Sequence, residues 1–84
     1  MSTPYPTTYA TMIAANLDAL YLRLRQALKL ADDSRLAMAD GKQNLAIGTI
    51  VDLERVLPEC EALYRTILIL HRSRDSFEQN EVHS

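Results

Sequence analysis

The sequence has little of what usually stabilises or activates so small a chain: of 84 residues, one is cysteine, two are histidine, two are glycine and none is tryptophan. The single Cys60 excludes an internal disulfide bond and suits a reducing compartment, so we expect a cytoplasmic protein. Structural zinc needs four Cys or His ligands, whereas Cys60, His71 and His83 match no zinc-binding spacing. We therefore expect no metal and no other cofactor.

Long apolar runs and an excess of basic charge are also missing. The longest wholly aliphatic run, residues 67–70, is far below the roughly 20 residues that span a bilayer. The first residues lack the basic and apolar segments of a secretion signal. A net charge of −2 gives phosphate backbones little reason to approach. The sequence therefore predicts neither a membrane nor a nucleic-acid partner.

The spacing of the acidic, histidine and cysteine residues does not bring potential catalytic groups together. Acidic pairs such as Glu59 and Glu61 have no histidine or metal ligand on their own helical face. On one helix Cys60 and His71 would lie about 16 Å apart, too far for a thiolate–imidazole pair. The segment Asp40-Gly41-Lys42 has one glycine and makes a turn, not a phosphate-binding loop. We predict that the protein is not an enzyme.

What the sequence does have is apolar residues at helical spacing, within a composition that is 48% hydrophobic. After Pro4 and Pro6, a helix is expected to begin at Thr7 or Thr8. Its seam residues alternate three and four apart: Ala10, Ile13, Leu17, Leu20, Leu24, Ala27 and Ala31. A second row, Ala14, Tyr21 and Leu28, widens the apolar face on one side.

A second arm follows the turn expected at Asp40-Gly41, where glycine closes the first helix and Asp40 or Asn44 can cap the next. Its seam is Ala46, Ile50, Leu53, Leu57, Cys60, Tyr64, Ile67 and His71, and its flanking row is Thr49, Val56, Leu63 and Leu70. Pro58 should kink this helix without ending it, because the apolar phase continues beyond the proline. After Arg72 the periodicity is lost.

Residues 32–40 allow two interpretations. Asp32 and Asp33 either end the first helix and cap a short one, or face solvent while the first helix continues to about Ala39. We favour the second, because good helix formers follow and Met38 is in phase with the seam.

These patterns predict an all-α protein, an antiparallel helical hairpin of two long helices with the second kinked at Pro58. The expected boundaries are a flexible lead over residues 1–6, a helical domain over 7–73 and a disordered polar tail over 74–84. One seam leaves the flanking rows uncovered, so we expect the hairpin to dimerise into a four-helix bundle. The predicted interaction surface is Tyr21, Leu28, Val56, Leu63 and Leu70.

Our first hypothesis is a non-enzymatic protein–protein interaction module: a small oligomerising regulator, chaperone or assembly subunit. Its expected partners are a second copy of the chain and another helical protein. The alternatives are a small-molecule or metal-binding helical bundle using Cys60, Tyr64 and His71, or a regulator acting on nucleic-acid proteins. The short basic stretch of Arg23, Arg25 and Lys29 is typical of a solvated helix face.

One short pattern resembles the second half of a tetratricopeptide repeat and the start of the next: Gly41, Ala46, Ile50, Leu53, Pro58 and Tyr64. It covers about one repeat, and upstream Asp33 would occupy an apolar repeat position. A single repeat cannot bury its own face. We therefore treat the pattern as chance and assign no repeat family.

Overall fold

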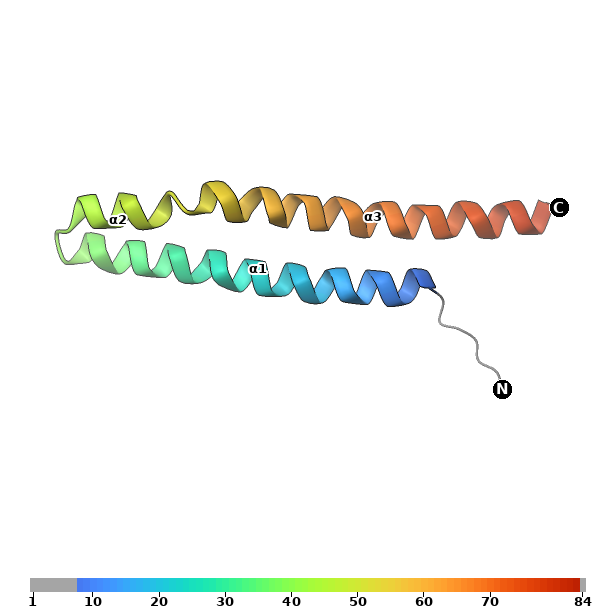
Figure 1. Cartoon of the computed structure of the whole chain (residues 1–84), viewed down its shortest axis with the longest axis horizontal. Coiled ribbons are helices and arrows are strands. Elements are labelled where there is room, and N and C mark those ends of the chain that lie inside the picture. The colour runs from blue at the N-terminus through green and yellow to red at the C-terminus, as the bar shows by residue number, and fades with distance from the viewer. Residues whose placement is uncertain (1–7, 84) are drawn as a thin grey trace.

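The computed structural model describes the backbone of residues 8–83 and the side chains of residues 8–73. Within this part, the elements are α1 (Thr8–Ala39), α2 (Gln43–Ile50) and α3 (Leu53–His83), and no strand occurs. Helices α2 and α3 follow one another along a second arm that runs antiparallel beside α1 (Figure 1). The predicted all-α hairpin is confirmed. The predicted flexible lead, residues 1–6, lies outside the described residues.

Helix α1 is continuous over 32 residues, so the first helix does extend to Ala39. Its two consecutive aspartates form surface ion pairs within the helix: Lys29 Nζ lies 3.1 Å from a carboxylate oxygen of Asp33, and the Arg35 guanidinium pairs with Asp32. Oppositely charged side chains three or four residues apart stabilise a helix. The acidic residues therefore support α1 and do not end it.

The turn between the arms is closed by Gly41, which has a φ of 75°. The Lys42 N–H donates to the Ala37 carbonyl and the Gly41 N–H to the Met38 carbonyl, each at 2.9 Å. This pair of hydrogen bonds is the Schellman motif, which satisfies the last carbonyls of a helix. At the start of α2 no side-chain capping bond is formed, so the capping role predicted for Asp40 or Asn44 is wrong.

The second arm is bent as expected, but the helix is interrupted at Val51–Asp52, upstream of Pro58. Residues 49–51 are all β-branched, which lowers helix propensity. Here the N–H of Asp52 donates to the Thr49 carbonyl at 3.3 Å, a tighter turn than an α-helix makes. Pro58 lies inside α3, where its missing N–H removes a partner from a carbonyl of the first turn only.

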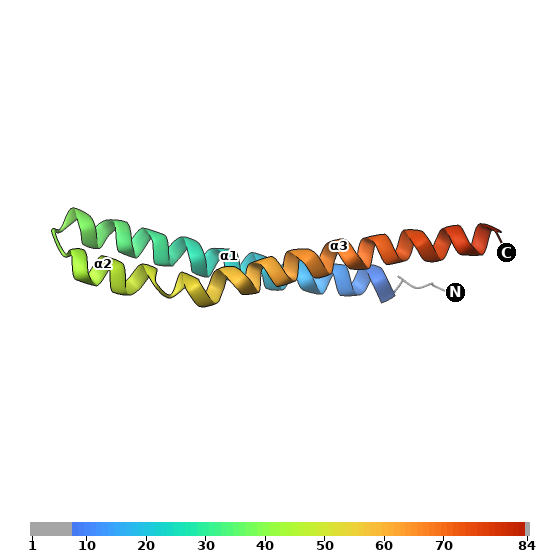
Figure 2. The same cartoon turned by 90° about the horizontal axis from the view of Figure 1, so that it is seen from above.

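The arms meet along one seam and cross at a shallow angle (Figure 2). Buried or half-buried residues recur at alternating spacings of three and four on both arms, the pattern of two helices packed side by side. On α1 the seam is Tyr9, Ile13, Asn16, Leu20, Arg23, Ala27, Leu30, Ser34 and Ala37, of which Arg23 alone is exposed. On the second arm it is Ala46, Thr49, Leu53, Val56, Cys60, Leu63, Ile67 and Leu70.

The observed seam differs from the predicted seam by one row of residues on each arm. The rows containing Ile13 and Leu53 do lie in the seam. Beside them, the structure uses the row of Leu30 on α1 and the row of Val56 on the second arm. The rows predicted for these places point outward: Leu17, Leu24, Met38 and Leu57 are each 50% exposed, and Tyr64 is 55% exposed. Both choices keep the same spacing, so spacing alone did not distinguish them.

The hairpin is a single layer of helices. Its extents are 65 × 26 × 14 Å and its radius of gyration is 19.3 Å, against about 12 Å for a compact domain of this length. The backbone of α3 is helical as far as His83, beyond the start of α1 (Figure 1), so the second arm is longer than the loss of periodicity after Arg72 predicts. A single layer has two broad faces, and no element among residues 8–83 covers either.

Candidate interaction surface

Groups that could hold a metal do not gather in the described part of the chain. Among those residues there is no cluster of three or more His, Cys, Asp or Glu side chains. Cys60 is buried in the seam, as the sequence predicts for a small apolar residue, whereas His71 lies exposed on α3. The structure therefore does not place Cys60 and His71 in one pocket.

The basic stretch of α1 is engaged within the chain. Arg23 pairs with Glu59, Lys29 pairs with Asp33, and the Arg25 guanidinium carbon lies 5.7 Å from the centre of the Tyr21 ring. Each contact directs one cation toward a local acidic or aromatic group. Arg25 and Lys29 line one shallow depression, and Asp33 is an acidic member of its lining.

The polar side chains of the seam are mostly satisfied by their own helix. Asn16 Nδ2 donates to the Met12 carbonyl and Ser34 Oγ donates to the Leu30 carbonyl, both at 2.8 Å. Such bonds to the carbonyl four residues earlier let a polar side chain occupy a packed position without an unpaired group.

One ion pair links the arms near the middle of the seam. Arg23 Nε lies 3.1 Å from Glu59 Oε1. That oxygen is shielded from solvent and receives no well-directed hydrogen bond, although both side chains as a whole are nearly half exposed. At such exposure an ion pair contributes at most about 1 kcal/mol, so it is a minor part of the contact between the arms.

Most large apolar side chains lie outside the seam. The buried apolar residues of the described part are Ala37, Ala46, Val56, Cys60 and Leu70, and Val56 is the one large side chain with no exposure at all. By contrast, fourteen large apolar side chains are exposed. An exposed apolar surface of this extent is typical of an association site.

The exposed apolar residues divide between the two broad faces of the hairpin. In two antiparallel helices, the residues that directly follow a seam residue in the sequence lie on one broad side of the layer. Those that directly precede a seam residue lie on the other. We name one side the Leu24 face; its large exposed residues are Leu17, Tyr21, Leu24, Leu28, Met38, Ile47, Leu57 and Tyr64. The opposite side, the Leu22 face, carries Met12, Leu22, Leu36, Leu45 and Ile69.

Two charged residues of the Leu24 face, Arg35 and Glu61, are paired toward its edges. Glu61 bonds Arg65 at 2.7 Å, and Arg35 bonds Asp32. Asp32 and Arg65 belong to the rows at the outer edges of the layer, so these pairs draw the two charged groups away from the middle of the face. Among the side chains that the structure describes, Glu54 is the remaining charged residue in the rows of this face.

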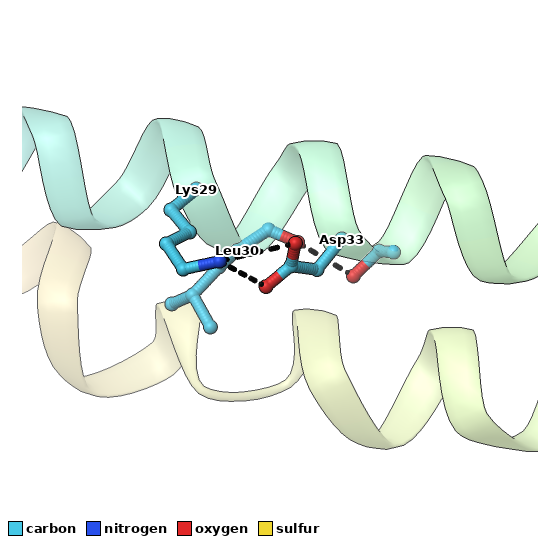
Figure 3. A network of polar contacts seen from close by, with 4 residues as sticks. Lys29, Leu30 and Asp33 are labelled. Atoms are coloured by element: carbon cyan, nitrogen blue, oxygen red, sulfur yellow. Dashed lines mark hydrogen bonds and ion pairs between the residues drawn. The ribbon is translucent and has the colours of Figure 1, made fainter.

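The Leu22 face has its charges in the middle. Figure 3 shows Lys29 and Asp33 bonded to each other on α1, beside the seam residue Leu30, whose side chain points toward the second arm. Asp52, Arg55 and Glu59 occupy the same broad side of the second arm. The apolar residues of the Leu22 face are therefore separated toward its ends.

The predicted interaction residues divide between the surface and the seam. Tyr21 and Leu28 are exposed by 60% and 70%, as predicted. Val56 and Leu70 are buried and Leu63 is half-buried between the arms of the same chain, so the expectation that these three are left uncovered is wrong. The row of Val56, Leu63 and Leu70 forms part of the contact between the two arms of one chain.

The sequence did not predict the outward position of Leu57 and Tyr64 on the second arm, or of Leu17 and Leu24 on α1. The signal was present, because three adjacent apolar rows are more than one seam can cover. On the second arm the spacing did not tell which two of the three would meet α1. On α1 the row that the structure uses includes Asn16 and Arg23 and is not an apolar row.

Comparisons with known proteins add no further constraint: no protein-family model matches the chain, and neither a curated protein nor a solved structure is detectably similar to it. In the described part of the chain, no helix has the length and apolarity that crossing a membrane requires.

Proposed function

We propose that this chain is a non-enzymatic protein–protein interaction module, a small helical subunit that works by self-association as a regulator, chaperone or assembly component. The observation that supports this is the distribution of apolar side chains: many large ones are exposed on a single helical layer whose seam buries few. Burying such side chains against a second helical surface provides a favourable free energy of roughly 1.5–3 kcal/mol for each one fully covered.

We further propose that the assembly is a four-helix bundle. A two-helix layer that pairs with another two-helix layer becomes a four-helix bundle, in which helices from both layers surround one core. Most soluble homo-oligomers are closed and symmetric, and a twofold dimer is the commonest form. A homodimer is therefore the simplest assembly that would cover this surface, and another helical protein would cover it by the same contacts.

Sedimentation equilibrium of the purified chain at micromolar concentration tests the proposal. We expect a mass near twice the 9.5 kDa of one chain. Circular dichroism of the same sample should show high helix content. A monodisperse, fully helical monomer across the accessible concentrations would contradict the proposed function, because the exposed apolar surface would then be stable in water.

A further inference from the structure

We propose that a second copy of this chain docks on the Leu24 face, so that two hairpins stack with these faces together and their Leu22 faces outward. This inference rests on the proposed function and specifies the surface through which it operates. It assigns contact roles to Leu24, Leu57 and Tyr64, which the sequence places in the hairpin seam.

The size of the face fits a stable dimer. Helix α1 has 32 residues, so two such helices side by side present a surface about 48 Å long and about 20 Å wide, or roughly 1,000 Å². A standard protein–protein interface buries about 800 Å² on each partner. One hairpin therefore supplies enough surface for a second hairpin without a contribution from residues outside the described part.

The distribution of side chains favours this face over the other. The Leu24 face holds eight of the fourteen large exposed apolar residues, and they follow one another along both arms. The Leu22 face holds five, interrupted by the Lys29–Asp33 pair and by Arg55. Stacking on the Leu22 face would remove these charged groups from water, and even for an ion pair the cost of desolvation can exceed the attraction between the charges.

The shape and charge of the face also suit a second copy. At the interruption between α2 and α3, a shallow apolar depression is lined by Ile47, Ile50, Leu57 and neighbouring residues, and such a depression can receive a side chain of a facing helix. In a twofold contact each surface meets its own copy. Among the described residues of the Leu24 face, Arg35 and Glu61 are paired toward its edges and Glu54 lines the depression. The charges are few and of both signs, so two copies approach without strong repulsion.

A lipid surface is the less favoured occupant. Amphipathic helices that bind membranes carry Lys and Arg along the polar rim of the apolar face. Here the outer edge of α1 carries Asp18, Arg25 and Asp32, and that of the second arm carries Arg72 and Arg65, the latter paired with Glu61. The rim is thus of mixed sign, and the chain has a net charge of −2. A protein surface of the same kind fits this rim better than anionic lipid does.

Matched double substitutions test the face. Leu24→Glu with Leu57→Glu places two charges on the proposed interface, whereas Leu22→Glu with Ile69→Glu places two on the opposite face, at positions of similar exposure on the same helices. We expect the first variant to raise the dimer Kd at least about 100-fold, since each fully buried leucine is worth roughly tenfold or more. The second variant should keep the wild-type Kd.

The outcomes separate this inference from the proposed function. A wild-type dimer that survives Leu24→Glu with Leu57→Glu, or that is lost equally in both variants, would overturn the face assignment and leave self-association standing. A wild-type chain that is a folded monomer would instead refute the proposed function. If wild-type chain with vesicles of anionic lipid sediments while remaining monomeric in solution, the second copy is the wrong occupant.

Cross-linking provides a test that does not depend on weakening the dimer. Replacing the buried Cys60 by alanine leaves no cysteine, and Leu24→Cys or Leu22→Cys then introduces one on either face. Leu24 stands near the middle of α1, so its two copies come close in whichever direction the second hairpin points. A short bismaleimide should couple two chains of the Leu24→Cys variant only; coupling through Leu22→Cys, or through neither, would overturn the inference.

Discussion

At the scale of single residues, stability depends on a few seam positions. Val56 is fully buried, and the other deeply buried apolar residues include two alanines and one cysteine. Small side chains near the turn, Ser34, Ala37 and Ala46, let the helices approach closely there. Asn16 and Ser34 keep polar groups satisfied by bonding within α1. Each large seam residue therefore accounts for a considerable share of the packing within one chain.

Replacing Val56 by alanine should lower the free energy of unfolding by about 2 kcal/mol, because two buried methyl groups are removed and the seam cannot close around the gap. Urea denaturation followed by circular dichroism measures this. The control is Val51→Ala, at a position that is 47% exposed, where we expect a change below about 0.5 kcal/mol. Equal losses in the two variants would contradict the assignment of Val56 to the seam.

At the scale of elements, two short segments determine the course of the chain. The turn at residues 40–42 reverses it, and Gly41 is the residue whose backbone lies in the left-handed region. The interruption at Val51–Asp52 divides the second arm where three β-branched residues precede an aspartate. Unlike Gly41, Gly48 lies within α2 in an open environment. The two glycines therefore have opposite structural roles.

Alanine substitution should therefore change stability in opposite directions at the two glycines. Gly41→Ala places a side chain at a φ of 75° and should destabilise the hairpin by about 1–2 kcal/mol. At Gly48 an added Cβ meets no atom within 4 Å, and alanine should stabilise α2 by about 0.5–1 kcal/mol. Thermal unfolding of the two variants beside wild type checks both signs; stabilisation by Gly41→Ala would refute the turn geometry.

At the scale of the whole molecule, the hairpin is long, one layer thick and more apolar on one broad face than on the other. A single seam between two helices buries few large side chains, whereas ordering each residue costs conformational entropy. If the chain dimerises as proposed, the covered face shares in the stability of the fold. Folding and association are then linked, and stability depends on protein concentration.

A tenfold increase in protein concentration should accordingly raise the Tm by about 3–5 °C for a dimer of this size. Scanning calorimetry at several concentrations measures the shift. The Leu24→Glu with Leu57→Glu variant is the matched control, and its Tm should be independent of concentration. A wild-type Tm that does not change with concentration would argue against coupled folding and association.

The sequence by itself determined the class and the course of the fold. Apolar residues every three or four positions specify helices, Gly41 specifies the reversal, and two arms of similar length specify a hairpin. The continuity of α1 through Asp32 and Asp33 also followed from residues close in sequence. These features depend on local backbone preferences and on periodicity, and both can be read along the chain.

The tertiary structure alone decided which rows face inward. On the second arm the apolar stripe is three rows wide, and either outer row gives the same alternation of three and four when combined with the central one. On α1 the structure instead uses a row that includes Asn16 and Arg23, which the apolar pattern does not mark. The choice depends on how the facing helix packs, as in the contact between Arg23 and Glu59, which joins residues far apart in sequence. Periodicity fixes the direction of a side chain around its own helix axis but carries no information about where the neighbouring helix lies.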